Sequence, residues 1–221
     1  MNSGTVKALC GGSVAAMALI AGATAAGGPL NAEASGVYAN RADLARATRP
    51  DARASVVEFL ASTGKTSGTT DALVETSAFK RGDGVSFARY EQRVGGLRVH
   101  GSYIKAAFGK NGELIHLIER TTDASAPVGA AAIDEASALR IAVNANFGNQ
   151  PTPFAGRIDG AVTTFSRTPF FYRAPTVERV IVADAGLAEG FLVETWSASD
   201  NKLYHTLVSG RGDVISNELR T

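Results

Sequence analysis

The stretch from Arg89 to Glu119, RYEQRVGGLRVHGSYIKAAFGKNGELIHLIE, decides the fold. Its polar and apolar side chains alternate as in a half-exposed β-strand, once before Gly95-Gly96 and again after them. Two consecutive glycines accept the positive φ of a tight reversal, and Asn111-Gly112 is typical of a two-residue hairpin loop. We therefore predict three sequential antiparallel strands over residues 85–94, 97–108 and 113–120.

The flanking sequence predicts helices and further strands. IDEASALRIAVNANFG is typical of an amphipathic helix that Asp134 caps and Gly148 ends, and a shorter helix is expected after Asp51. We expect loop at residues 63–71 and a long covering segment at residues 149–176. The chain then gives four strand-like runs: VERVIVAD, GFLVETWSAS, KLYHTLVSG and DVISNELR. This pattern predicts an α+β fold with antiparallel sheets and a packed helix.

Composition argues against some partners. The chain has 221 residues, with 22 Lys and Arg against 21 Asp and Glu. The positive residues are scattered along the sequence, whereas a nucleic-acid or anionic-lipid surface needs them clustered. We therefore predict no nucleic-acid partner.

Residues 1–25 have the layout of a signal peptide. Lys7 supplies the positive charge, VAAMALIAGATAA supplies a short apolar run, and Ala23-Thr24-Ala25 supplies a small-x-small cleavage site. That run is shorter than the ~20 residues of a membrane-spanning helix, so no stable membrane span is expected. We predict a secreted or periplasmic protein with a flexible mature N-terminus over residues 26–51. Cys10 is the single cysteine, which excludes an intrachain disulfide.

No catalytic motif is recognisable. The three histidines do not form His-Glu-x-x-His, and His116 and Glu119 fall on opposite faces of a strand. There is no Gly-x-Ser-x-Gly, and Gly64-Lys65-Thr66 lacks the earlier glycine of a phosphate loop, where Phe59 stands. A carboxylate pair hidden among the dispersed acids remains open. We predict no enzyme activity, no catalytic or metal-binding residue and no cofactor, and we expect Trp196 to pack inward.

The opening stretch resembles the motif of the fungalysin/thermolysin propeptide (FTP) domain. That motif reads aromatic, x, Gln, x, apolar, x, Gly, apolar, x, Val, x, Gly. Seven positions match it in register: Tyr90, Gln92, Val94, Gly96, Leu97, Val99 and Gly101. Members of the family often carry proline just before the valine, where this chain has Arg98.

The resemblance extends from about Ala52 to Thr221. The region after the predicted helix is similar to the PepSY-like second half of fungalysin-type pro-regions. The resemblance implies two small PepSY/cystatin-like lobes in tandem, an FTP-like domain over 52–126 and a PepSY-like domain over 127–221. Arg220-Thr221 falls about where such pro-regions hand over to the peptidase.

The resemblance also implies a function. Pro-regions of this kind are non-catalytic, and they act as inhibitor and intramolecular chaperone of a cognate zinc metallopeptidase domain, in cis or in trans. The peptidase domain itself is absent from these 221 residues. An exposed strand edge suits such a task, because it pairs with an extended segment through backbone hydrogen bonds.

Two alternatives stay open. One alternative to the pro-region is a stand-alone exported module that binds proteins or inhibits peptidases, and the reading frame after codon 221 discriminates the two. Tyr90 and Gln92 either contact the peptidase or only pack and hydrogen-bond within the sheet, and we favour packing.

Overall fold

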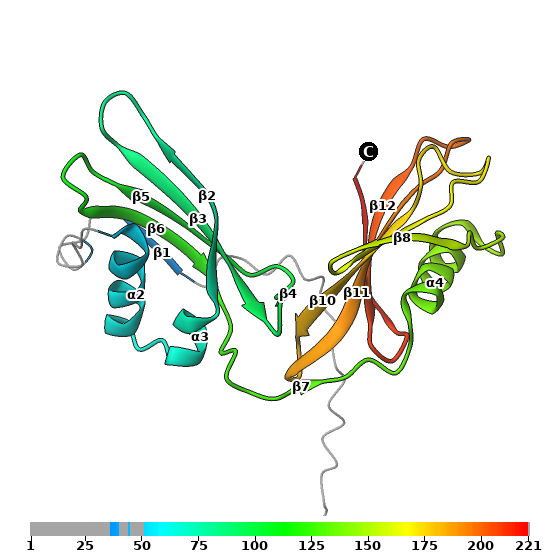
Figure 1. The fold of residues 1–221 in the computed structure, drawn as a ribbon, viewed down its shortest axis with the longest axis horizontal. Helices are drawn as coiled ribbons and strands as arrows, with labels where there is room; N and C mark the ends of the chain where they lie inside the picture. The colour runs from blue at the N-terminus through cyan, green and yellow to red at the C-terminus, as the bar shows by residue number, and fades with distance from the viewer. Residues whose placement is uncertain (1–35, 40–43, 45–50, 221) are drawn as a thin grey trace, which may run out of the picture.

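The computed structural model describes residues 36–39, 44 and 51–220. They form two mostly antiparallel sheets with helices, which confirms the α+β class (Figure 1). Lobe 1 contains β1 (Gly36–Ala39), α2 (Ala52–Ser62), α3 (Ser67–Asp71), β2 (Leu73–Lys80), β3 (Ser86–Val94), β4 (Leu97–Arg98), β5 (Tyr103–Phe108) and β6 (Leu114–Arg120). Lobe 2 contains β7 (Val128–Gly129), α4 (Glu135–Phe147), β8 (Ala155–Asp159), β9 (Val162–Phe165), β10 (Thr176–Ala183), β11 (Leu187–Trp196), β12 (Leu203–Ser209) and β13 (Val214–Leu219).

The three predicted strands form the centre of the first sheet. Its order is β1-β6-β5-β3-β2, with β4 paired to β3. Gly95 and Gly96 have φ of 58° and 85°, as a two-residue turn between β3 and β4 requires.

The loop between β5 and β6 differs from the predicted two-residue hairpin. Gly109 accepts a hydrogen bond from the amide of Gly112 at 3.0 Å and donates its own to the carbonyl of Glu113 at 2.8 Å. Among these loop residues only Gly112 has positive φ, at 85°. The reversal is therefore a longer turn that ends in a left-handed glycine, so Asn111 needs no positive φ.

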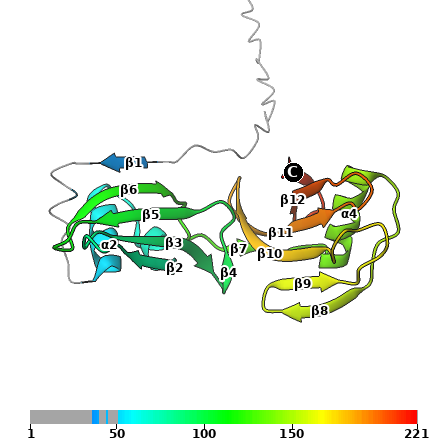
Figure 2. The same cartoon turned by 90° about the horizontal axis from the view of Figure 1, so that it is seen from above.

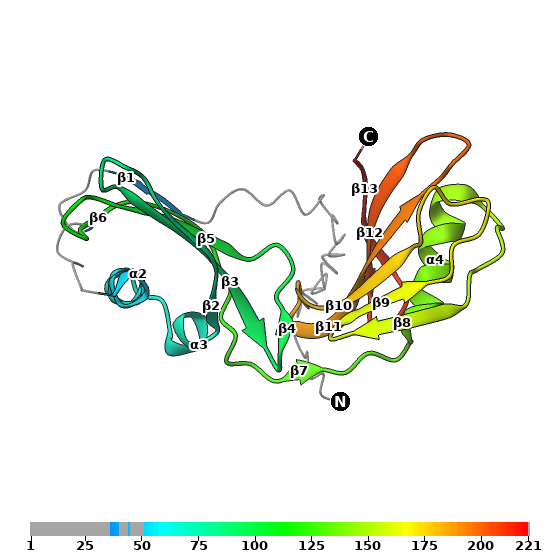
Figure 3. The same cartoon turned by 45° about the horizontal axis from the view of Figure 1, so that its top comes forward.

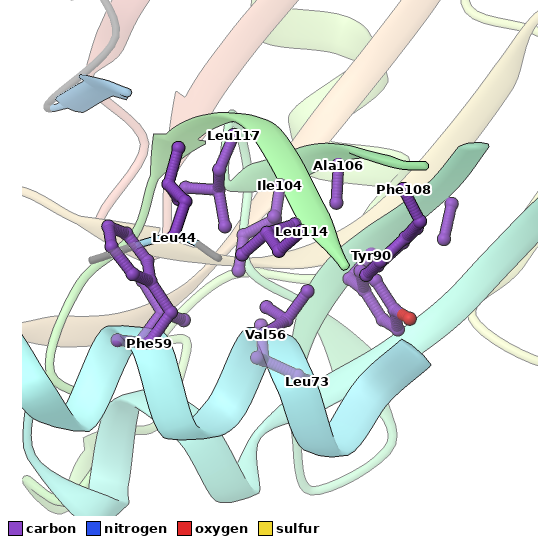
Figure 4. Packing of buried hydrophobic residues seen from close by; sticks show 12 residues of the cluster. Leu44, Val56, Phe59, Leu73, Tyr90, Ile104, Ala106, Phe108, Leu114 and Leu117 are labelled. Atoms are coloured by element: carbon purple, nitrogen blue, oxygen red, sulfur yellow. The ribbon is translucent and has the colours of Figure 1, made fainter. Parts of the chain in front are cut away.

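The core of lobe 1 lies between α2 and the sheet (Figure 4). The helix begins where the Asp51 side chain accepts hydrogen bonds from the amides of Arg53 and Ala54, each at 3.2 Å. Val56, Phe59 and Leu60 point from it into the sheet and are fully buried. The helix has no acidic residue in its first turn and no basic residue in its last turn, so charged side chains at its ends do not stabilise it. Its stability comes mainly from burial of the apolar face.

Three elements of lobe 1 were not expected. Residues 36–39, inside the segment expected to be flexible, form β1 and pair with β6. The expected loop contains α3, which Thr66 caps by accepting a hydrogen bond from the Thr69 amide at 3.4 Å. β2 was missed because all its residues except Leu73 are exposed, so its sequence shows no alternation.

The second sheet has the order β13-β12-β11-β10-β9-β8, with β7 alongside β11. α4 begins at Asp134, whose side chain accepts a hydrogen bond from the Ser137 amide at 2.8 Å, and it ends at Gly148 with φ of 72°. The four predicted strands are present as β10 to β13. The expected covering segment instead contains the hairpin β8–β9 at one edge of the sheet.

The two sheets diverge from the region of β4, β7 and the ends of β10 and β11 (Figures 1 and 3). The helices lie on the outer sides, α2 and α3 on the first sheet and α4 on the second. One face of each sheet is therefore uncovered by any helix within the described residues. None of the helices within these residues is long and apolar enough to cross a membrane.

Candidate functional site

Gln92 on β3 joins three segments of lobe 1. Its side chain is fully buried. The amide nitrogen donates to the carbonyl oxygens of Thr69, at 3.2 Å, and Thr122, at 2.7 Å. The amide oxygen accepts from the backbone amide of Thr122 at 2.9 Å. Gln92 thus fixes α3 and the chain after β6 to the sheet, and a buried side chain cannot contact a partner without local unfolding.

Tyr90 lies two residues earlier on the same face of β3. It is fully buried beside Phe108 in the core of lobe 1 (Figure 4). Its hydroxyl has no hydrogen-bond partner among the described residues. Burial, followed by the negative charge of Glu75, raises the pKa of Tyr90 above its ordinary value. The ring therefore fills the core, and its hydroxyl lies near the Glu75 carboxylate without a well-formed hydrogen bond.

We expect Tyr90→Phe to leave the free energy of unfolding within about 0.5 kcal/mol of the unsubstituted chain. Removing a buried hydroxyl that makes no hydrogen bond also removes its desolvation cost. Tyr90→Ala, which leaves a cavity, is expected to cost about 3 kcal/mol or more. Urea unfolding measures both values, and a loss from Tyr90→Phe as large as that from Tyr90→Ala would refute the assignment of Tyr90 to packing.

The second half of the motif forms the joint between the lobes. We define the joint as a cluster of eight apolar residues: Val94, Leu97, Val99, Ala124, Val128, Ile181, Ala183 and Leu187. Val99 is 2% exposed and forms a parallel bridge with Ile181 of β10. The His100 amide donates to the Ile181 carbonyl at 2.7 Å. Backbone hydrogen bonding and apolar burial therefore both fix lobe 1 to lobe 2.

Gly101, the last motif position, follows the joint. Its φ is 73°, a region that residues with a side chain rarely adopt. A Cβ atom there would also lie 3.2 Å from Nη1 of Arg120. The positive φ therefore favours glycine at this position, whereas the end of the flexible Arg120 side chain could move to accommodate a Cβ atom.

Arg98 occupies the position where the family often has proline, and here it crosses the joint. Its Nε lies 2.5 Å from Oε1 of Glu178 on β10, and its Nη2 lies 2.7 Å from Oε2. Both side chains are about three-quarters buried. A bidentate ion pair of this kind is stronger and more directional than a surface ion pair. Arg98 therefore orients the two sheets.

We expect Arg98→Ala and Glu178→Ala each to destabilise the chain by about 1 to 2 kcal/mol, since each leaves one partly buried charge unpaired. The double variant should cost less than the sum of the two, with a coupling energy of about 1 kcal/mol in a thermal or urea unfolding cycle. Strict additivity would contradict the pairing. Arg157→Ala and Asp159→Ala, at an exposed pair on β8, form the control cycle, for which we expect near-zero coupling.

His100 directly follows Val99 and so lies beside the joint. Its Nδ1 is buried and has no hydrogen-bond partner among the described residues. Burial, followed by the positive charges of Arg98 and Arg120, lowers the pKa of His100 to about 4, against the opposing charges of Glu218 and Glu178. The imidazole is therefore neutral near pH 7 and resists protonation in mild acid.

A comparison with known protein families matches one segment of lobe 1. Residues 71–118, from the end of α3 through β6, match the family model "Fungalysin/Thermolysin Propeptide Motif". The chain carries an FTP motif. The expected resemblance is thereby confirmed over this FTP segment, which contains all seven motif positions and reaches from the buried residues of β3 to the joint.

Two further comparisons add little. No curated protein sequence matches the chain. Among solved structures, the chain is similar to the Bacillus megaterium YpeB C-terminal domain, at 14% sequence identity and a TM-score of 0.30. That alignment covers 78% of this chain and 66% of the YpeB chain. The function therefore has to be argued from the FTP segment and the geometry.

Of the other predicted site residues, Arg220 alone is among the described residues. Ala23, Ala25 and Thr221 lie outside the described residues. Arg220 is exposed, donates its backbone amide to the Leu203 carbonyl at 2.8 Å and pairs with Glu218 at 3.0 Å. The predicted pro-region end thus follows directly on β13, an edge strand of the second sheet.

Two of the side chains considered for chemistry, Lys65 and His205, have structural partners. Nζ of Lys65, the lysine of Gly64-Lys65-Thr66, lies 2.9 Å from the buried carboxylate of Glu119. His205 lies 2.9 Å from Glu194, which also pairs with Arg173. Within residues 36–39, 44 and 51–220, no three His, Cys, Asp or Glu side chains gather closely enough to hold a metal ion.

We expected Trp196 to pack inward. Instead it is only partly buried, and it lies on the face of the second sheet opposite α4. Its ring centroid lies 4.6 Å from that of Tyr172, which is 57% exposed. The guanidinium of Arg173 lies 5.5 Å from the Trp196 ring. Strand alternation causes this placement, because Val193 and Thr195 already occupy the buried face.

Proposed function

We propose that this chain is the pro-region of a secreted zinc metallopeptidase of the fungalysin type, and that it inhibits the peptidase and assists its folding. The observation that carries the proposal is the FTP motif at residues 71–118, since this motif belongs to peptidase propeptides. Its buried half stabilises lobe 1 and its second half fixes the two lobes to each other. The motif thus builds a scaffold in which, among the described residues, one face of each sheet carries no helix.

Such a scaffold suits binding without catalysis. A partner that lies against sheet faces and strand edges gains backbone hydrogen bonds and apolar contacts, and neither needs a reactive side chain. Covalent linkage to the peptidase would raise the effective concentration of the pro-region to the millimolar range. Inhibition in cis should therefore be stronger than inhibition by the separate chain.

The proposal includes the chain boundaries. Residues 1–25, with Ala23 and Ala25 at the cleavage site, direct export to the outside of the cell or to the periplasm. Residues 52–126 form the FTP-like unit, residues 127–221 form a PepSY-like unit, and the pro-region ends near Arg220-Thr221. Mass spectrometry of the exported protein measures the first boundary directly.

An inhibition assay tests the function. Residues 26–221 are purified and added at micromolar concentration to a fungalysin-type zinc peptidase, with thermolysin as a second zinc peptidase, and peptide hydrolysis is followed. We expect slower hydrolysis by the fungalysin-type enzyme at least. A serine peptidase serves as the control, and unchanged rates for both zinc peptidases would refute the proposal.

A further inference from the structure

The hairpin of β2 and β3 carries apolar side chains that the fold leaves exposed. Phe79 is 63% exposed, Val74 41% and Phe87 38%. The rings of Phe79 and Phe87 stack with centroids 6.4 Å apart. In Figure 2, β2 forms the outer edge of its sheet, on the same side of the molecule as β8. Exposed large apolar residues clustered on an edge strand mark an interaction surface.

Among the described residues, no strand pairs with the outer edge of β2. The Arg81 amide donates to the Val85 carbonyl at 2.7 Å, so Arg81 is a hydrogen-bonded position toward β3. Hydrogen-bonded positions alternate along an antiparallel pair, and the β2–β3 register continues without interruption from Ser77 to Lys80. The backbone groups of Ala78 and Lys80 therefore point away from β3. They present two donors and two acceptors to an added strand.

Two hollows flank this edge, one on each face of the sheet. One has a volume of about 240 Å³ and is lined by Ser77, Phe79, Phe87, Arg89 and Lys105 among others. The other has a volume of about 270 Å³, and its lining includes Ala52, Ala78, Lys80 and Phe108. Successive side chains of a strand point to opposite faces. A strand added to β2 would therefore direct alternate side chains toward the two faces that carry these hollows.

Charge identifies the occupant. Two cationic side chains, Arg89 and Lys105, line the first hollow, and no acidic residue does. Arg89 is partly neutralised by Glu91 at 3.2 Å, whereas Lys105 lies over the Tyr103 ring at 5.4 Å. Both hollows have mainly apolar linings, but the lining of the second also contains Glu75 and Lys80, whose opposite charges balance. The matching segment is extended and alternates acidic and apolar side chains.

We propose that the β2 edge at Ser77–Lys80 binds an extended segment of a partner protein by strand addition. Its acidic side chains enter the hollow beside Arg89 and Lys105, and its apolar side chains enter the hollow beside Ala78 and Phe108. The partner is the peptidase, and only this identification of the partner rests on the proposed function.

Peptide binding tests the site without any peptidase. The ¹⁵N-labelled chain of residues 26–221 is titrated with a soluble peptide of alternating glutamate and valine, and with one of alternating lysine and valine. We expect the first peptide to shift the amide signals of Ala78, Lys80 and Lys105 and to slow hydrogen exchange at Ala78 and Lys80. No response at these positions up to millimolar peptide, or an equal response to the lysine peptide, would overturn the proposal.

Two pairs of variants sharpen the test. Ala78→Pro removes one outward amide and should abolish binding, while Ala78→Ser retains the amide and should bind normally; proline is tolerated at an edge position whose amide faces solvent. Lys105→Glu should weaken binding of the glutamate peptide at least about five-fold. Lys110→Glu changes an exposed lysine in the β5–β6 turn and should not. Circular dichroism confirms that each variant is folded.

Three other outcomes are decisive. The amide signals of Ala78 and Lys80 could shift with rising protein concentration in the absence of peptide. That result would show that the occupant of the edge is a second copy of this chain and not a segment of a partner protein. Normal peptide binding by Ala78→Pro would exclude strand addition. If the zinc peptidases are not inhibited but the peptide binds as expected, the edge site holds and the proposed function fails.

Discussion

Replacing Gln92 with alanine is expected to lower the free energy of unfolding of lobe 1 by about 3 to 5 kcal/mol, because it leaves one buried and two partly buried backbone groups without a partner, at about 1 to 3 kcal/mol each. These groups are the carbonyl of Thr69 and both the carbonyl and amide of Thr122. Hydrogen exchange of the β3 and β5 amides measures the loss.

The chain contains its own control for this variant. Trp196 is the single tryptophan and lies in lobe 2, so its fluorescence reports on that lobe separately. We expect the free energy of unfolding of lobe 2, measured by urea unfolding with Trp196 fluorescence, to fall by less than that of lobe 1, measured by hydrogen exchange. Glu91→Ala, next to Gln92 on an exposed ion pair, should change stability by less than about 0.5 kcal/mol. A Gln92→Ala chain as stable as Glu91→Ala would contradict the role assigned to Gln92.

Acid is expected to destabilise the chain through His100. The folded-state pKa is about 4, against 6.5 for the ordinary imidazole. Between these values the unfolded chain binds a proton that the folded chain does not, so stability present above about pH 6.5 is lost as the pH falls toward 4. One pKa unit corresponds to about 1.4 kcal/mol, and after allowance for partial exposure we expect a loss of about 2 kcal/mol.

Comparison with a non-titrating variant isolates this contribution. Urea unfolding from about pH 7 to about pH 4.5 is measured for the original chain and for His100→Gln, so that the titration of the carboxylates cancels in the difference. The His100→Gln curve should be flatter by about 2 kcal/mol. His116→Gln, on β6 away from the joint, serves as control. Identical pH dependence for the original chain and His100→Gln would show that His100 is not buried as described.

Sequence patterns predicted those helices and strands whose formation depends on residues close together in the sequence. Alternation together with Gly95-Gly96 predicts β3 and the strands that follow, because each glycine sits where positive φ is needed. Asp134 and Gly148 mark the ends of α4 by capping. The sequence did not predict β2, because β2 is a strand through its pairing with β3. Its side chains stay exposed, so they show no alternation of buried and exposed positions. The same holds for β8, an exposed edge strand.

The joint could be predicted only in part. The motif positions Leu97 and Val99 were identified, but their partner Ile181 belongs to another strand run and carries no local signal. Arg98 and Glu178 are 80 residues apart, and each taken alone looks like an ordinary exposed charge. The partners of Gln92 are backbone groups of Thr69 and Thr122, which any residue type would supply. Such contacts depend on the tertiary fold.

The central claim is that this chain acts by lying against a peptidase and performs no chemistry itself. Hydrolysis of a fluorogenic peptide by a fungalysin-type zinc peptidase, mixed with an equimolar amount of residues 26–221 and followed over time, tests it most directly. The account predicts low initial activity that returns as the peptidase degrades the added chain. Full activity from the first time point, or hydrolysis by the added chain alone in the presence of zinc, would contradict it.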